Sequence, residues 1–141
     1  TKSVNNEPGD KKGSDTMGMK YRVEFGVYKF QGSINVQLAE GTGFSKDDAK
    51  KVKGALLTIF ENDASSARPE GSMELSLFYW IEHKSGCASS ATVHRSVTAR
   101  KKEGVDIPKR WEDYVFDDSA LYALRDLCIE KYVRGVSVEG N

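Results

Sequence analysis

A chain of 141 residues has the length of one ordinary domain and can build a core without disulfide or metal staples, although its charged and glycine-rich composition predicts a lean core. Its 21 basic residues balance 21 acidic ones, so overall charge does not by itself indicate a nucleic-acid partner, and any such site must depend on local clustering. No apolar run approaches the roughly 20 residues that span a bilayer, which excludes a transmembrane helix.

The two cysteines, Cys87 and Cys128, stand far apart and outside any Cys-x-x-Cys spacing. This pattern supports neither a zinc site nor a dense disulfide framework, so we predict no metal and no cofactor. Few cysteines are typical of a reducing compartment, and the polar amino terminus has no apolar signal segment. We therefore expect a cytoplasmic protein that does not contact a membrane.

The first part of the chain predicts a flexible arm followed by one domain. Residues 1–20 contain almost nothing apolar, and we expect the folded domain to occupy residues 21–141. The chain begins with Thr1 rather than methionine, so we expect a fragment of a longer subunit. Apolar residues alternate with polar ones over residues 21–38, which predicts a strand that bends at its two glycines.

The middle of the chain predicts one helix and two strands. Ser45, followed three residues later by Asp48, resembles a capping box and predicts a helix over residues 46–62. The aromatic-rich residues 73–82 predict a largely buried strand. Alternation over residues 92–100 predicts a second strand, and we expect the two to pair as an antiparallel hairpin.

The last third predicts an exposed basic loop over residues 101–110 and a second helix. Asp117 and Asp118 are suitable amino-terminal caps for that helix, which we expect over residues 118–134, with a short strand over residues 136–138 behind it. Read in order, the chain is an α+β protein with an antiparallel sheet and two helices. This is the ferredoxin-like order that also underlies the RNA-recognition motif.

Several short phrases match a known family in register over residues 15–102. They are Thr16-Met17-Gly18-Met19-Lys20, Phe25-Gly26-Val27-Tyr28, Leu38-Ala39-Glu40, Thr42-Gly43-Phe44-Ser45, Phe60-Glu61-Asn62-Asp63, Ser65-Ser66-Ala67-Arg68 and His83-Lys84-Ser85. Through them the chain resembles the carboxy-terminal half of the backbone subunit of the type I-C CRISPR surveillance complex, Cascade.

The resemblance implies a modified RNA-recognition fold, of which this chain holds only part, and a non-catalytic role in antiviral defence. It implies that several copies stack along one guide CRISPR RNA and grip its backbone. The implied partners are the guide RNA, further copies of the chain and other Cascade subunits, with target DNA reached indirectly through the guide.

A protein that coats RNA regardless of sequence needs cations aimed at phosphates. The residues that we predict to contact RNA are Lys20, Arg22, Arg68, His83, Lys84, Arg95, Arg100 and Lys101. Lys102 extends the same positive region. The resemblance favours Lys20 and Arg68 most, because the matching family motifs sit near the RNA. The alternative for each residue alone is an ordinary solvated charge.

Two pairs of side chains leave alternatives open. Phe78 and Trp80 lie on one face of the predicted strand, where they could stack on bases, although the apolar run around them favours a core role. His83 and His94 could face each other across the predicted hairpin as a structural pair, and no further ligand spacing supports a metal.

The sequence shows no nucleophile with a base, no glycine-rich phosphate loop and no paired carboxylates, so we predict that the chain is not an enzyme. The balanced charge favours one alternative function, a ferredoxin-like module for protein interaction or oligomerisation that does not bind RNA.

Overall fold

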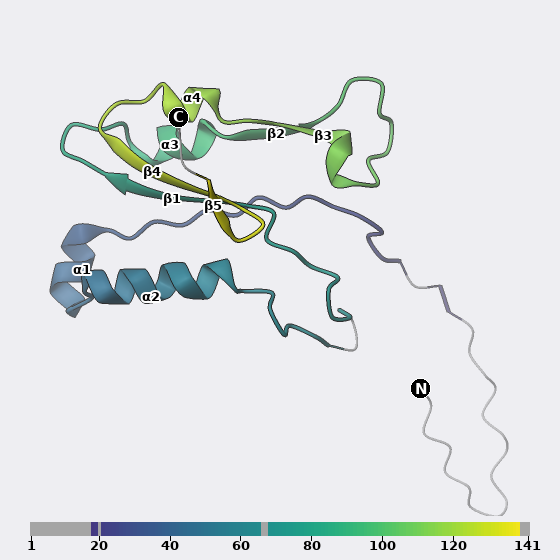
Figure 1. Ribbon diagram of the computed structural model, residues 1–141, viewed down its shortest axis with the longest axis horizontal. Coiled ribbons are helices and arrows are strands. Elements are labelled where there is room, and N and C mark those ends of the chain that lie inside the picture. Colours follow the sequence, from purple (N-terminus) through teal and green to yellow (C-terminus); the bar gives the residue numbers. More distant parts are fainter. Residues whose placement is uncertain (1–17, 20, 66–67, 139–141) are drawn as a thin grey trace, which may run out of the picture.

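The computed structural model describes residues 18–19, 21–65 and 68–138 (Figure 1). In chain order its elements are α1 (Val36–Thr42), α2 (Lys46–Leu57), β1 (Leu77–His83), α3 (Ser90–Arg95), β2 (Thr98–Lys101), the 3-10 turn η1 (Trp111–Asp113), β3 (Tyr114–Asp117), α4 (Ser119–Tyr122), β4 (Leu127–Val133) and β5 (Val136–Val138). The predicted α+β class with antiparallel pairing is confirmed, and it is consistent with a small ferredoxin-like domain. The predicted arm over residues 1–20 lies almost wholly outside the described residues.

Two antiparallel sheets are formed. The larger has the strand order β1-β4-β5, and the smaller is a two-stranded ribbon of β2 and β3. The predicted hairpin between residues 73–82 and 92–100 is therefore wrong, since β1 pairs along its whole length with β4 and not with β2. The predicted strand, helix, strand, strand, helix, strand order is also not the observed one.

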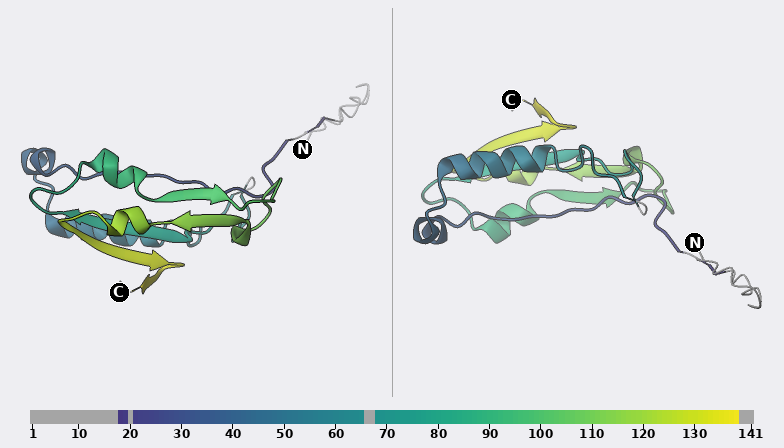
Figure 2. Two further views of the ribbon diagram at one scale, coloured as in Figure 1. Left: turned by 90° about the horizontal axis from the view of Figure 1, so that it is seen from above. Right: turned by 90° about the horizontal axis from the view of Figure 1, so that it is seen from below.

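The elements lie in layers around the larger sheet. Helix α2 covers one face of that sheet, as the view from below in Figure 2 shows. Helices α3 and α4 and the β2–β3 ribbon lie on the opposite side (Figure 1). Both faces of β1 are therefore covered, which leaves its central side chains within the protein rather than at a free surface.

The start of α2 is confirmed as the sequence predicts. Ser45 Oγ accepts a hydrogen bond from the Asp48 backbone N–H at 3.1 Å, and Asp48 Oδ2 accepts one from the Ser45 N–H at 2.9 Å. The helix ends at Leu57, five residues before the predicted end, and residues 58–62 form turns. Asn62 there has a φ of 59°, which a continuing helix does not allow.

The predicted strand over residues 21–38 is wrong. Residues 21–35 form neither helix nor paired strand, and α1 begins directly after them, where Asn35 caps it by accepting a bond from the Leu38 N–H at 3.1 Å. A strand needs a neighbour to complete its ladder, and within the described residues no strand pairs with this segment. We call residues 21–34 the extended segment.

The predicted strand over residues 92–100 is half right. Its first part is the helix α3, because Ser89 caps the chain at this point by accepting a bond from the Thr92 N–H at 3.3 Å. Its second part is the strand β2, which pairs with β3 so that Thr98 faces Asp117 and Lys101 faces Tyr114.

The predicted helix over residues 118–134 is wrong beyond its first turn. Helix α4 has only four residues, Asp126 then takes a φ of 60°, and the chain continues as β4. Asp117 accepts bonds from the Ser119 N–H at 2.9 Å and from the Ser119 hydroxyl at 2.6 Å. Asp118 is the N-cap by position but makes no side-chain capping bond. The predicted last strand, β5, is confirmed.

The core is small. Phe78 is 9% exposed, Val93 3% and Leu121 0%, and these three are the buried hydrophobic residues of the described part. The Phe78 ring centre lies 6.4 Å from that of Trp80 and 5.9 Å from that of Tyr132. The core interpretation of Phe78 is therefore confirmed.

Two neighbouring residues of the central strand β4 tie it to the layers on either side. On the α2 side, Glu130 accepts bonds from Lys53 Nζ at 2.9 Å and from the Tyr132 hydroxyl at 2.6 Å. On the α4 side, Lys131 Nζ donates to Asp118 Oδ2 at 2.7 Å, and the Tyr79 hydroxyl donates to the same oxygen at 2.8 Å. Burial and this bond raise the pKa of Tyr79, so it remains a donor.

The Asp118 contacts predict an acid-dependent loss of stability. Hydrogen bonds from Lys131 and Tyr79 hold the pKa of Asp118 below its ordinary value of 3.8. The ionised carboxylate therefore stabilises the fold above that ordinary pKa, and the contribution is lost as pH falls through the lowered value of the folded state. Asp118→Asn is expected to reduce the fall in the free energy of unfolding between about pH 5 and about pH 2.

Urea unfolding followed by tryptophan fluorescence at several pH values measures this dependence. Asp106→Asn, in an exposed loop, is the matched control and should leave the pH dependence unchanged. A wild-type slope retained by Asp118→Asn would contradict the assignment.

Candidate nucleic-acid interface

Three predicted RNA-contacting residues follow one another along a single stretch of chain. Arg95 ends α3, Arg100 and Lys101 belong to β2, and Lys102 follows directly. All four side chains are exposed, and in the part of the chain that the structure describes none pairs with a carboxylate within 4 Å. We call these four residues the cationic strip. Their charges remain available to an anionic partner.

An open groove of about 660 Å³ lies beside the start of the strip. Its lining comes from the extended segment on one side and from α3 and β2 on the other: Lys29, Gln31, Ala91, His94, Arg95, Val97, Thr98 and Ala99. We call it the α3–β2 groove. Two of its lining residues carry full positive charges, Lys29 and Arg95, and none is acidic.

Lys29 joins the two walls of this groove. Its Nζ donates hydrogen bonds to the backbone carbonyls of His94 and, at 2.8 Å, of Val97. These carbonyls belong to the carboxyl end of α3 and the residues after it, where a cation offsets the negative end of the helix dipole. Sequence reasoning missed Lys29, since nothing in the alternating pattern around it indicates which partner its side chain meets.

The far end of the strip borders a second open groove, of about 550 Å³. Lys101 Nζ donates to the Asp106 carbonyl here at 3.0 Å, which holds the loop after β2 against the strand. Glu103 and Asp106 also line this groove, so its charge is mixed. The start of the strip, beside the α3–β2 groove, is therefore its more positive end.

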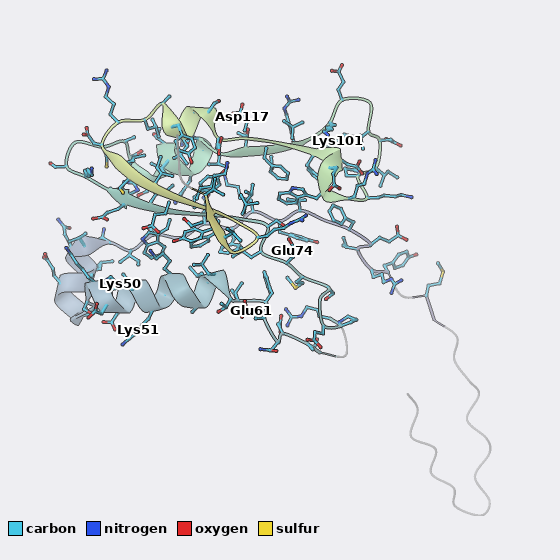
Figure 3. The ribbon with its side chains drawn as sticks, viewed as in Figure 1. Lys50, Lys51, Glu61, Glu74, Lys101 and Asp117 are labelled. Carbon is cyan, nitrogen blue, oxygen red and sulfur yellow. The ribbon has the colours of Figure 1, made fainter. Side chains whose placement is uncertain are left out.

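Arg100 lies near an acidic residue of the paired strand. Hydrogen bonds from the Ser119 hydroxyl and N–H hold the pKa of Asp117 below its ordinary value, and the Arg100 charge contributes in the same direction. Asp117 therefore stays ionised and is satisfied largely by Ser119. Figure 3 shows Asp117 and Lys101 towards opposite ends of the β2–β3 ribbon.

Aromatic rings share the ribbon face that carries Lys101, because Lys101 pairs with Tyr114 and Ala99 with Phe116. Trp111 and Phe116 stack with ring centres 4.0 Å apart and an interplanar angle of 17°, and Tyr114 lies 6.2 Å from Phe116. Phe25 of the extended segment packs 6.3 Å from Tyr114. All four rings are partly buried, so they pack beside Lys101, while Arg100 points to the opposite face of the ribbon.

Arg68 lies apart from the strip. The loop joining α2 to β1 is on the α2 side of the larger sheet, whereas β2 lies on the opposite side (Figure 1). Arg68 also forms an ion pair with Asp63 at 3.3 Å, and its N–H donates to Ser65 Oγ at 3.1 Å. Its charge is thus partly balanced within its own loop.

The remaining predicted residues are dispersed. His83 ends β1, with Nδ1 at 3.2 Å from Cys87 Sγ, and the Lys84 N–H donates to the Asp126 carbonyl at 2.9 Å. His94 belongs to α3, so the expected pair with His83 across a hairpin is wrong. Arg22 is exposed on the extended segment, and Lys20 lies outside the described residues.

Neither a metal-ligand cluster nor a membrane-spanning helix is found within the residues that the structure describes. Among these residues, no group of three or more histidine, cysteine or acidic side chains is placed to hold a metal ion. No helix in the same ranges has both the length and the apolar character needed to cross a membrane.

Comparison with known proteins identifies the family to which the chain belongs. A search of curated proteins finds no match. The family model described as CRISPR-associated protein Cas7 matches residues 1–118, which is most of the 141-residue chain and includes the extended segment, the α3–β2 groove and the cationic strip. The chain therefore belongs to the CRISPR-associated protein Cas7 family.

Proposed function

We propose that this chain is part of a non-catalytic backbone subunit that coats guide CRISPR RNA in a Cascade complex. We assign it to the type I-C kind and to the carboxy-terminal half of that subunit, which the ordered sequence phrases over residues 15–102 support. Its partners would be the guide RNA, further copies of itself and other Cascade subunits, with target DNA recognised through pairing to the guide.

The observation that carries the proposal is the cationic strip beside the α3–β2 groove. Four exposed basic side chains lie within eight residues of sequence and make no ion pair among the described residues. Such cations attract phosphates, and binding them releases counterions from the RNA. The core position of Phe78 supports backbone contact over base stacking on β1, because a buried ring offers no face to a base.

This proposal predicts RNA binding that ignores sequence and weakens with salt. Fluorescence anisotropy of the whole 141-residue chain with two unrelated labelled single-stranded RNAs should give Kd values that agree within about threefold. With three or four phosphates contacted, log K should fall with log salt at a slope of about −2 to −3, since each contributes about −0.7 on a single strand.

A Kd that does not change with salt, or no binding even at low salt, would contradict the proposal. Size-exclusion chromatography before and after nuclease treatment separates it from a protein-interaction module. A nuclease-resistant oligomer that contains no RNA would favour the module.

A further inference from the structure

The extended segment makes few hydrogen bonds with the rest of the molecule. Within the described residues, no backbone hydrogen bond joins residues 21–34 to another part of the chain, and the side-chain hydrogen bonds that do so both come from Lys29. Phe25 also packs on Tyr114, with ring centres 6.3 Å apart. Yet this segment supplies Lys29 and Gln31 to one wall of the α3–β2 groove.

We propose that Lys29 is a positioning residue for RNA binding: it holds the extended segment against the end of α3 and so forms the groove beside Arg95. The inference rests on the proposed function. In this proposal the cationic strip contacts phosphate, whereas Lys29, a basic residue beside it, holds the extended segment in place.

The geometry separates the two tasks. The Lys29 ammonium group has three donors, and two of them are directed at the carbonyls of His94 and Val97. Carbonyl oxygens at a helix end stabilise the cation where it is, so Lys29 is held away from a phosphate. Arg95, one residue beyond His94, makes no ion pair in the described part and is exposed. Arg95 is therefore the group that contacts RNA phosphate, and Lys29 holds the extended segment in place on the opposite side of the α3–β2 groove.

A positioning role and a phosphate contact differ in their salt dependence. Removing a phosphate contact lowers the magnitude of the salt slope by about 0.7, whereas removing a positioning group lowers affinity and leaves the slope nearly unchanged. We expect Lys29→Met to weaken RNA binding about fivefold, as the loss of a charged hydrogen-bond donor implies, with the slope preserved. Arg95→Gln should weaken binding and also reduce the slope.

A second measurement does not require RNA. Chymotrypsin can cut after Phe25, four residues from the substitution, once the segment leaves its place against Tyr114. Lys29→Met should therefore accelerate cleavage at Phe25 several-fold, and Lys29→Arg, which keeps donors for both carbonyls, should restore much of the protection.

Lys50→Met is the matched control. Lys50 is exposed on α2, and it lies 3.8 Å from Asp47, three residues earlier on the same helix (Figure 3). This variant loses the same charge without touching the groove, so it should change neither the cleavage nor the salt slope.

The outcomes separate cleanly. Unchanged cleavage in Lys29→Met would overturn the anchoring role, whatever the RNA result. A slope reduced as much as in Arg95→Gln would show that Lys29 contacts phosphate and would overturn the positioning role. Absence of RNA binding by the wild-type chain would overturn the proposed function and the positioning role with it, while accelerated cleavage would still establish the anchor.

Discussion

Replacing Arg95 and Arg100 together with glutamate is expected to raise the Kd for single-stranded RNA by about 100-fold, since each charged hydrogen bond contributes about 1.5 kcal/mol or more. Both arginines belong to the cationic strip, one at the end of α3 and one on β2. On the proposed function, each substitution would remove a phosphate contact and introduce a repulsive charge in its place. Fluorescence anisotropy at a fixed salt concentration measures the change.

The double variant Lys50→Glu, Lys51→Glu is the control for net charge. These two lysines lie on α2, on the other side of the larger sheet from β2, and Figure 3 shows them far from Lys101. The change in total charge is the same, so this variant should lose less than about threefold in affinity. An equal loss in both variants would mean that total charge, and not the strip, determines binding.

Phe78→Ala is expected to lower the free energy of unfolding by about 3 to 5 kcal/mol, the usual loss when a core phenylalanine is truncated. Phe78 is 9% exposed and packs against the rings of Trp80 and Tyr132, so alanine would leave a cavity under α2. A small core of three buried hydrophobic residues in the described part has little to offset that loss. Urea unfolding monitored by circular dichroism gives the value.

Phe78→Leu is the milder comparison and should cost less, because leucine fills more of the same space. RNA affinity of the folded Phe78→Ala protein, measured at low temperature, should be close to wild type. A stable alanine variant with weakened RNA binding would mean that Phe78 meets the RNA and would contradict the core assignment.

The parts of the fold that sequence predicted well are those set by local chemistry. The Ser45 and Asp48 capping box fixes the start of α2 through bonds between two residues three positions apart, and no distant partner is needed. The strand β1 was recognisable because its run of apolar and aromatic residues suits a covered strand.

The parts that sequence misjudged depend on partners far along the chain. Leu121, Leu124 and Leu127 are spaced as on a helix, yet β1 supplies a seven-residue ladder that draws the chain from Leu127 onward into β4. The extended segment shows the converse, since it alternates as a strand should but meets no ladder among the described residues. Hydrophobic periodicity indicates which secondary structure a segment can adopt, and the presence of a neighbouring strand decides whether it becomes part of a sheet.

In the candidate site too, sequence predicts the residues that cluster locally and misses those whose role depends on distant partners. The clustering of Arg95, Arg100 and Lys101 in sequence predicts a shared site, and the structure places them along one exposed stretch of chain, with Arg100 and Lys101 on opposite faces of the β2–β3 ribbon. Arg68 was linked to them only through the family resemblance, and its loop lies on the α2 side of the molecule, away from β2. Lys29 was missed because its role comes from two carbonyls more than 60 residues away.

The opposite charges of Glu130 and Lys131 also fix how β4 aligns with its neighbours. Neighbouring side chains of a strand point to opposite faces, so sliding β4 by one residue would exchange these two. Glu130 would then face the like charge of Asp118, and Lys131 would face the like charge of Lys53. In the observed register each of them faces an opposite charge instead. Misaligned pairing would therefore bring like charges together on both faces of the sheet at once, which disfavours the shifted register on each face.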